Sequence, residues 1–265
     1  MNPYLKNLEK LEFAVTDSCT GKCKHCSQGE HKCGAEIDPL IASAAVKRVA
    51  AEYKIKTVMT FGGEPLLHPS AVYEIISAAK DVGVPKRQLI TNGYFSKSEA
   101  AVRDVAKALA ECGVNDLLLS VDAFHQETIP LSAVMHFAKC AKEYKIPIRL
   151  QPAWLVSSED KNPYNLKTRE ILNAFSDMSL PEGSGNTVFP EGNALKYLGE
   201  YFCQDKTKDR SSALSPGTWQ ALPKNPYIED PKDIHTLSFS ADGAVLSGNI
   251  YKTDIMEIIK IYNPD

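Results

Sequence analysis

Residues 11–26 read LEFAVTDSCTGKCKHC, a short apolar run followed directly by three cysteines, Cys19, Cys23 and Cys26. The run at residues 11–16 predicts a buried β-strand, so the cysteines lie on the loop that follows it. Three thiolates on one tight loop are typical of a 4Fe–4S site, in which each thiolate binds one iron. One iron then lacks a protein ligand, and its open position is available to a substrate or cofactor, as in catalytic zinc sites.

Two other metal sites fit the same loop. A tetrahedral zinc ion would take its fourth ligand from His25, His31 or Cys33, and Cys33 would alternatively close the cluster and remove its open iron. A disulfide is disfavoured because the chain has seven cysteines, an odd number, and its first ten residues lack the apolar core of a secretory signal. The cysteines indicate a reducing compartment, and we expect a cytoplasmic protein.

Composition sets the broad class of the protein. The chain has 265 residues, of which 43% are hydrophobic and 24% charged, with a formal net charge of -3. This is typical of a globular domain with room for one large core. No apolar run is long enough to cross a bilayer, so no membrane partner is expected. The weak negative charge gives no electrostatic reason for non-specific binding to nucleic acid.

Short β-rich runs alternate with longer stretches of helical periodicity. Strands are predicted at residues 11–16, 57–61, 88–91, 116–121, 146–151 and 187–189, and helices at residues 39–53, 70–82, 98–112, 130–144, 166–177 and 193–202. Such alternation predicts a parallel sheet covered by helices. Six units are fewer than the eight of a closed barrel, so we predict an α/β fold, a partial (βα)6 barrel.

Unusual polar clusters follow the first four predicted strands. The cysteine loop follows the first strand, the run Gly62-Gly63-Glu64-Pro65 the second, Asn92 the third, and the run 122–125 the fourth. The carboxyl ends of parallel strands lie at one edge of the sheet, where such folds carry their chemistry. We therefore expect all four clusters on one rim.

The C-terminal part changes character after residue 202. Residues 211–231 have little periodicity and predict a loop, residues 234–246 predict a β-hairpin around Asp242-Gly243, and residues 255–261 predict a short helix. We assign residues 1–202 to the core and residues 203–265 to a C-terminal extension.

From about residue 11 to residue 202 the chain resembles the radical S-adenosylmethionine (radical SAM) superfamily. Cys19, Cys23 and Cys26 match its CxxxCxxC signature, residues 62–65 match its GGEP motif after the second strand, and Ser120 with Asp122 matches a Ser-x-Asp pattern after the fourth. The resemblance implies a partial barrel with one 4Fe–4S cluster, whose open iron binds S-adenosylmethionine.

The resemblance also implies roles for single residues. Glu64 would accept a bond from the amino group of the cofactor's methionine part, with the flanking Gly62, Gly63 and Pro65 shaping the loop. Ser120 and Asp122 would bind the ribose hydroxyls, and His25 would lie near the adenine.

Three further residues are candidates for cofactor binding. Asn92 follows the third strand as in this superfamily, and its amide would bond cofactor or substrate. Arg149 and Gln151 share one face of the fifth strand because side chains alternate along a strand. If that face points inward, Arg149 would pair with the cofactor's carboxylate; otherwise it is a solvated charge at the strand end.

The extension is similar to the Twitch and SPASM extensions of some superfamily members, but it lacks their cysteines. Ser247 stands where a cysteine is expected, and Cys203 is the one thiol left in this region. One thiolate cannot hold a cluster, so we expect no auxiliary cluster.

The resemblance implies an oxidoreductase, working anaerobically, that reductively cleaves S-adenosylmethionine to methionine and a 5′-deoxyadenosyl radical. The radical would abstract hydrogen from an unidentified substrate, for which a peptide or protein side chain is the expected class. An external electron donor such as flavodoxin or ferredoxin is a further expected partner. The alternatives are a non-catalytic iron–sulfur electron carrier closed by Cys33 and a zinc-stabilised binding module.

Overall fold

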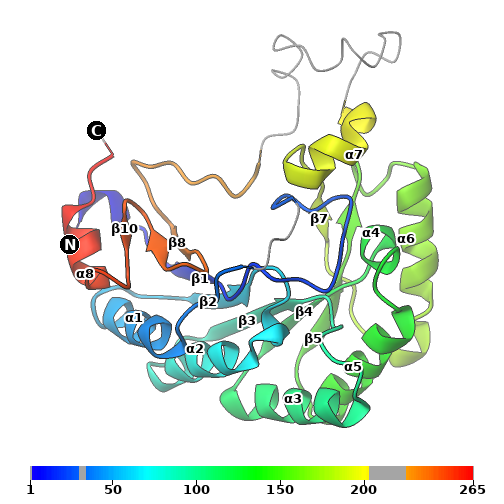
Figure 1. Ribbon diagram of the computed structural model, residues 1–265, viewed down its shortest axis with the longest axis horizontal. Coiled ribbons are helices and arrows are strands. Elements are labelled where there is room, and N and C mark those ends of the chain that lie inside the picture. The colour runs from blue at the N-terminus through cyan, green and yellow to red at the C-terminus, as the bar shows by residue number, and fades with distance from the viewer. Residues whose placement is uncertain (1, 30–33, 203–224, 265) are drawn as a thin grey trace.

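The computed structural model describes residues 2–29, 34–202 and 225–264, and a parallel sheet lies at its centre (Figure 1). Its strands are β1 (Lys10–Ala14), β2 (Thr57–Phe61), β3 (Lys86–Thr91), β4 (Asp116–Ser120), β5 (Ile148–Gln151), β6 (Ala153–Trp154), β7 (Asn186–Thr187), β8 (Thr236–Phe239), β9 (Ala244–Val245) and β10 (Gly248–Asn249). Its α-helices are α1 (Pro39–Glu52), α2 (Pro69–Asp81), α3 (Glu99–Cys112), α4 (Ala123–Gln126), α5 (Leu131–Glu143), α6 (Pro163–Asn173), α7 (Gly192–Phe202) and α8 (Ile255–Ile261), with 3-10 turns η1 (Pro3–Leu5), η2 (Pro65–Leu67) and η3 (Ser176–Met178).

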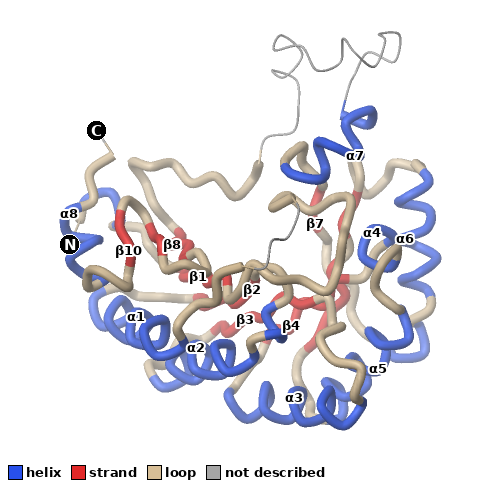
Figure 2. The backbone as a smooth tube through the Cα atoms, in the orientation of Figure 1, coloured by secondary structure: helices blue, strands red, loops and turns tan. Residues whose placement is uncertain are grey.

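The main sheet has six strands in the order β5-β4-β3-β2-β1-β8, and every neighbouring pair is parallel. Helices α1, α2, α3 and α5 line one side of this sheet, as Figure 2 shows. The predicted α/β class with a six-stranded parallel sheet is therefore confirmed. The edge strands are β5 and β8, so the sheet is open.

Local sequence signals set the ends of the helices. Asp38 caps α1 by accepting from the backbone N–H groups of Leu40 and Ile41, both at 2.9 Å. Pro39 occupies the first helical position, where its missing N–H costs nothing. Gly113 ends α3 in the left-handed region, with φ 102°, which glycine adopts without a steric penalty.

The core lies between the sheet and its helices. Leu11, Phe13, Leu89, Leu117 and Leu119 alternate along their strands and are fully buried. Because neighbouring side chains on a strand point to opposite faces, the residues between them face away from these helices. Polar residues such as Gln88, Asp116 and Arg149 therefore share the face that the helices leave uncovered.

The predicted hairpin at residues 234–246 is wrong in its pairing. Its first half forms β8, which lies parallel to β1, while β9 pairs with β10 instead. The rings of Phe13 and Phe239 stack with centroids 4.4 Å apart, and Leu237 is fully buried beside them. The predicted turn forms, with the Gly243 N–H donating to the Ser240 carbonyl at 2.9 Å, but β8 is buried against β1, so the predicted extension supplies a strand of the main sheet.

The predicted sixth strand also needs correction. It forms β7, two residues long, and pairs in parallel with β6 in a separate two-stranded sheet. Pro152 separates β5 from β6, because a proline has no N–H to donate to the ladder. The sixth unit thus follows the fifth in the expected order but lies outside the six-stranded sheet.

The N-terminal and C-terminal segments lie side by side (Figure 1). The Asn2 side chain donates to the backbone carbonyls of Ile259 and Tyr262, each at 2.8 Å. The predicted helix at residues 255–261 is confirmed as α8. Among the described helices, none has the length and apolar character needed to span a bilayer. The division at residue 203 falls at the edge of a stretch outside the described residues and stays a prediction.

Candidate active site

The cysteine loop leaves the end of β1 and returns beside it. Ile37 donates its backbone N–H to the Val15 carbonyl at 2.9 Å, and Thr16 forms an antiparallel bridge with Glu36. These bonds close the loop at its base and hold it over the carboxyl end of the sheet. His31 and Cys33, the extra ligands of the alternative metal sites, lie outside the described residues, as does Cys203.

The three predicted ligands converge on this loop. Cys23 is buried, while Cys19 and Cys26 are partly exposed. Cys26 donates its backbone N–H to the Cys23 carbonyl at 3.3 Å, and Gly29 donates its N–H to the Cys26 carbonyl, also at 3.3 Å. Burial raises the pKa of the Cys23 thiol, and the charges of Asp122, Cys19 and Cys26 raise it further. A buried thiol beside two others fits a strongly cationic group, which stabilises thiolates.

The GGEP loop is joined to the cysteine loop through backbone bonds. Gly63 donates its N–H to the Thr16 carbonyl and Glu64 donates to the Ser18 carbonyl, both at 2.8 Å. A Cβ on Gly63 would lie 2.1 Å from the Ser18 oxygen, and one on Gly62, at φ +136°, would lie 2.6 Å from the Thr16 oxygen. The two glycines are therefore required for the close approach of two loops of this chain.

The Glu64 carboxylate joins the loop after β2 to the loop after β3. It is fully buried, and it accepts from the Leu66 N–H at 3.0 Å, the Thr91 hydroxyl at 2.7 Å and the Asn92 N–H at 2.8 Å. Burial raises the pKa of Glu64 to about 7, and these three bonds oppose the rise. Pro65, also buried, opens η2 directly after it. Within the chain the side chain joins the loops after β2 and β3, and the predicted bond to the cofactor's amino group stays a prediction.

Asn92 faces the cysteine loop. Its amide nitrogen lies 3.7 Å from the Cys19 sulfur and 3.2 Å from the Thr20 hydroxyl. Its amide oxygen accepts from the Tyr94 N–H at 2.8 Å, and Thr20 in turn donates to the Tyr94 carbonyl at 2.6 Å. An amide donor at a thiolate is the kind of contact that sets the reduction potential of a cluster. The structure thus places Asn92 beside Cys19, one of the predicted cluster ligands.

The Asp122 carboxylate is fully buried, and protein groups occupy both of its oxygens. Oδ1 accepts from the N–H groups of Phe124 and His125 at 3.0 and 2.9 Å, and Oδ2 accepts from the Ala153 N–H at 3.1 Å. Nδ1 of His125 lies 2.8 Å from Oδ2. Burial raises the pKa of Asp122, but the charge and hydrogen bond of His125 outweigh it and hold this pKa at about 2. Within the chain its oxygens cap α4 and orient His125, and the predicted ribose contact of Asp122 stays a prediction.

Ser120 and Gln151 lie next to each other at the carboxyl ends of β4 and β5. They are register partners, and both belong to the face that the helices leave uncovered. The Gln151 amide nitrogen donates to the Asn186 side chain at 3.3 Å, while its buried Oε1 has no partner among the described residues. The structure brings the two predicted residues together, and their contact with the cofactor stays a prediction.

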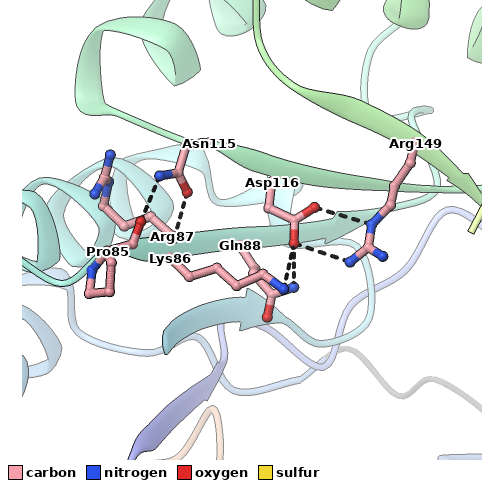
Figure 3. A network of polar contacts seen from close by, with 7 residues as sticks. All are labelled: Pro85, Lys86, Arg87, Gln88, Asn115, Asp116 and Arg149. Carbon is pink, nitrogen blue, oxygen red and sulfur yellow. Dashed lines mark hydrogen bonds and ion pairs between the residues drawn. The ribbon is translucent and has the colours of Figure 1, made fainter. Parts of the chain in front are cut away.

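Arg149 lies at the other end of the sheet. It forms the predicted two-pronged contact, but with Asp116: Nε and Nη2 each lie 3.1 Å from one oxygen of that carboxylate (Figure 3). Lys86 and Gln88 approach the same carboxylate at 3.1 and 2.7 Å. The structure pairs Arg149 with a carboxylate on the neighbouring strand, and its contact with the cofactor stays a prediction.

His25 lies between two predicted cluster ligands and packs against the start of α4. Its ring centroid is 4.9 Å from that of Phe124 and 4.7 Å from that of His125. Its buried Nδ1 has no partner among the described residues, and burial lowers the pKa of His25 to about 4. The ring is therefore neutral at physiological pH.

Three buried side-chain atoms lack a partner in the described part of the chain: His25 Nδ1, Gln126 Nε2 and Gln151 Oε1. All three belong to the carboxyl rim of the sheet. Buried polar atoms are nearly always bonded, so each of these three is a candidate to bond a ligand at the rim. The sequence analysis missed Gln126, although its position four residues after the helix-capping Asp122 places it on the same turn.

A model of the Radical SAM superfamily matches residues 13–149, just over half of the chain. The chain belongs to the radical SAM superfamily. Radical SAM enzymes use a 4Fe–4S cluster and S-adenosylmethionine, and the three converging thiols on the rim fit such a cluster.

Sequence relatives include enzymes named GTP 3′,8-cyclase. A probable GTP 3′,8-cyclase from Saccharolobus islandicus (strain L.S.2.15 / Lassen #1) is 28% identical over 212 residues, which cover 73% of this chain and 64% of that protein. The Clostridium perfringens (strain SM101 / Type A) GTP 3′,8-cyclase is 28% identical over 64% of this chain and 57% of its own. This radical SAM chain thus spans less than two thirds of the length of these relatives.

Solved structures share the fold. Streptococcus suis SuiB bound to the precursor peptide SuiA has a TM-score of 0.62 at 12% identity, covering 98% of this chain and 65% of that one. The anSMEcpe structure with bound AdoMet has a TM-score of 0.55 at 17% identity, covering 97% and 80%. At these identities the likeness extends to the fold alone.

Proposed function

We propose that this chain binds one 4Fe–4S cluster through Cys19, Cys23 and Cys26 and cleaves S-adenosylmethionine reductively. The bound cluster supplies one electron to the cofactor, releasing methionine and a 5′-deoxyadenosyl radical that abstracts hydrogen from substrate. One observation carries this proposal: backbone bonds join the cysteine loop to the GGEP loop, with glycines at the points of contact. Such bonds fix the position of the thiols without using side chains.

Residues at the carboxyl rim have separate roles in binding the cofactor. The partly exposed backbone of Gly62 and Gly63 presents polar groups to the cofactor's methionine part, while Glu64 holds the loop from behind. Ser120 and Gln151 offer a hydroxyl and an unpartnered amide oxygen, which suit the hydroxyls of a ribose. His25 provides a neutral ring for contact with the adenine. Asn92 donates toward Cys19.

Two classes of substrate remain to be tested. The sequence analysis favours a peptide or protein side chain. The relatives named GTP 3′,8-cyclase, at 28% identity, favour a guanine nucleotide as a second candidate. Both would react by the same first step, hydrogen abstraction. One assay for 5′-deoxyadenosine therefore serves for both, and the rate with each added substrate distinguishes them.

The proposal includes a partner and a compartment. A flavodoxin or ferredoxin would supply the electron that reduces the cluster before each cleavage. A cytoplasmic location would suit the five described cysteines, none of which forms a disulfide. Anaerobic conditions would protect the cluster.

The test is anaerobic reconstitution with iron and sulfide, followed by dithionite and a chromatographic assay for 5′-deoxyadenosine. We expect about four irons per chain and 5′-deoxyadenosine that depends on S-adenosylmethionine. The assay is repeated with GTP and with a peptide mixture, and the true substrate class raises the rate. A stable cluster that never cleaves the cofactor would support the electron carrier. Bound zinc without a cluster would support the binding module.

A further inference from the structure

A second group of side chains that can bind a metal shares Cys23 with the proposed cluster ligands. One ligand atom each from Cys23, His25 and His125 lies within 4.8 Å of the other two. Cys23 and His25 come from the cysteine loop, whereas His125 comes from α4. In a tetrahedral zinc site, with Zn–S about 2.3 Å and Zn–N about 2.0 Å, ligand atoms are about 3.5 Å apart. The three ligand atoms would have to approach one another by about 1 Å to reach that spacing.

His125 is held in the orientation of a metal ligand. Its Nδ1 lies 2.8 Å from Asp122 Oδ2, which leaves Nε2 available for coordination. Asp122 is itself fixed by its contacts with the N–H groups of Phe124 and Ala153. A carboxylate behind a histidine is the arrangement that sets the tautomer and direction of zinc-binding imidazoles.

His25 adds an independent observation. Its Nδ1 is buried and has no partner among the described residues, although an unpartnered buried polar atom is costly. The ring lies 4.7 Å from that of His125, nearly edge to face at 66°. A metal ion between these rings would satisfy the unpartnered nitrogen.

We propose that the cluster-free chain binds one divalent ion of the zinc or ferrous type through Cys23, His25 and His125. One thiolate and two imidazoles form a ligand set that such ions accept, and water takes the fourth position. Cys23 releases its proton to solvent on binding. Because Cys23 also ligates the cluster, the single ion and the cluster exclude each other. Asp122 acts in this site as the positioning residue for His125.

The proposal is tested with cobalt as a spectroscopic probe. Full-length protein freed of metal with a chelator is titrated with Co²⁺ without oxygen, and its absorption is followed. We expect one equivalent to bind with tetrahedral d–d bands and with charge-transfer intensity for one thiolate. His125→Gln should weaken Co²⁺ binding at least tenfold, because loss of a residue that merely orients a ligand already costs about 10–100-fold.

Matched variants separate this site from the cluster. Cys19→Ser should lose the 4Fe–4S cluster and keep Co²⁺ affinity, since Cys19 belongs to the cluster set alone. His125→Gln should still assemble the cluster, and one equivalent of Zn²⁺ should block assembly in the wild type but not in this variant. His136→Gln, on α5, is the control and should change neither result. Circular dichroism establishes that each variant is folded.

Two outcomes overturn the proposal. Charge-transfer intensity for three thiolates, lost in Cys19→Ser, would place the ion on the cysteine triad. Equal Co²⁺ affinity in the wild type and in folded His125→Gln would exclude His125 as a ligand. Neither outcome bears on the assembly of the cluster, so failure here is distinct from failure of the proposed function.

Discussion

The two ends of the same sheet are built by different means. At the carboxyl rim, backbone bonds join the loops, and three buried side-chain atoms of the described residues have no partner. At the amino end, Lys86, Gln88 and Arg149 converge on the Asp116 carboxylate, and these charges are satisfied within the protein (Figure 3).

This difference indicates that the carboxyl rim is a binding site and that the Asp116 network at the amino end is a structural contact. A network whose groups already bond one another has little left to offer a ligand, even when it carries an arginine and a lysine. The rim has polar atoms without a partner among the described residues, and its loops are held by backbone bonds and by the buried Glu64 and Asp122 carboxylates. Charge alone is therefore a poor guide to the site in this fold.

The largest expected effect is that of Cys19→Ala. Two thiolates cannot hold the cluster, so reconstituted iron and 5′-deoxyadenosine formation should fall to background. Asp116→Asn, at the other end of the sheet, should keep both. Iron analysis and the chromatographic assay measure the two effects. Full iron content in Cys19→Ala would refute the assignment of the ligands.

Gly63→Ala should come next, because the new Cβ would meet the Ser18 carbonyl oxygen at 2.1 Å. We expect most of the cluster to be lost and the free energy of unfolding to fall by about 1–3 kcal/mol, as for other overpacked sites. The matched control is Gly199→Ala on α7, where a Cβ meets nothing within 4 Å. That change should stabilise the helix by about 0.5–1 kcal/mol. Denaturant titration and iron content distinguish the two variants.

Glu64 should make stability depend on pH. Burial raises its pKa from 4.5 to about 7 in the folded chain. Between these values the native state holds a proton that the unfolded state has released, so the free energy of unfolding falls as pH rises. We expect a loss on the order of 3 kcal/mol across this window in the wild type, absent from Glu64→Gln.

Urea titrations at pH 4.5, 5.5 and 7 measure this difference. Parallel pH profiles for the wild type and Glu64→Gln would show that the carboxylate does not titrate as expected. In the cluster-bound protein, Glu64→Ala should weaken S-adenosylmethionine binding and leave the iron content intact, because it loosens the loop and removes no ligand.

The smallest effects belong to the amino end. Arg149 and Asp116 are partly exposed, with side-chain exposures of 35% and 17%. A double-mutant cycle with Arg149→Gln and Asp116→Asn should give a coupling of about 1 kcal/mol or less in unfolding free energy. Affinity for S-adenosylmethionine should not change. A marked loss of affinity for S-adenosylmethionine in Arg149→Gln would support the cofactor contact that the sequence suggested.

The sequence by itself determined the strand–helix order, the cysteine triad and the rim on which polar residues gather. These features follow from local periodicity, from ligand spacing and from the parallel strands that residue patterns predict. Glu64 and Asp122 lie at the rim as predicted, but their partners within the protein could not be predicted, because a motif identifies a position without naming its hydrogen-bond partner.

Only the tertiary structure decided which segments meet. The pattern of residues 236–239 fits a hairpin as well as a sheet edge, and burial of Phe239 against Phe13 settles the choice. Arg149 would fit a cofactor carboxylate or Asp116 equally well, and the register of β4 and β5 brings Asp116 within reach. The physical reason is the same in both cases: a short stretch of chain determines what a residue can bond, whereas long-range packing determines which partner is near.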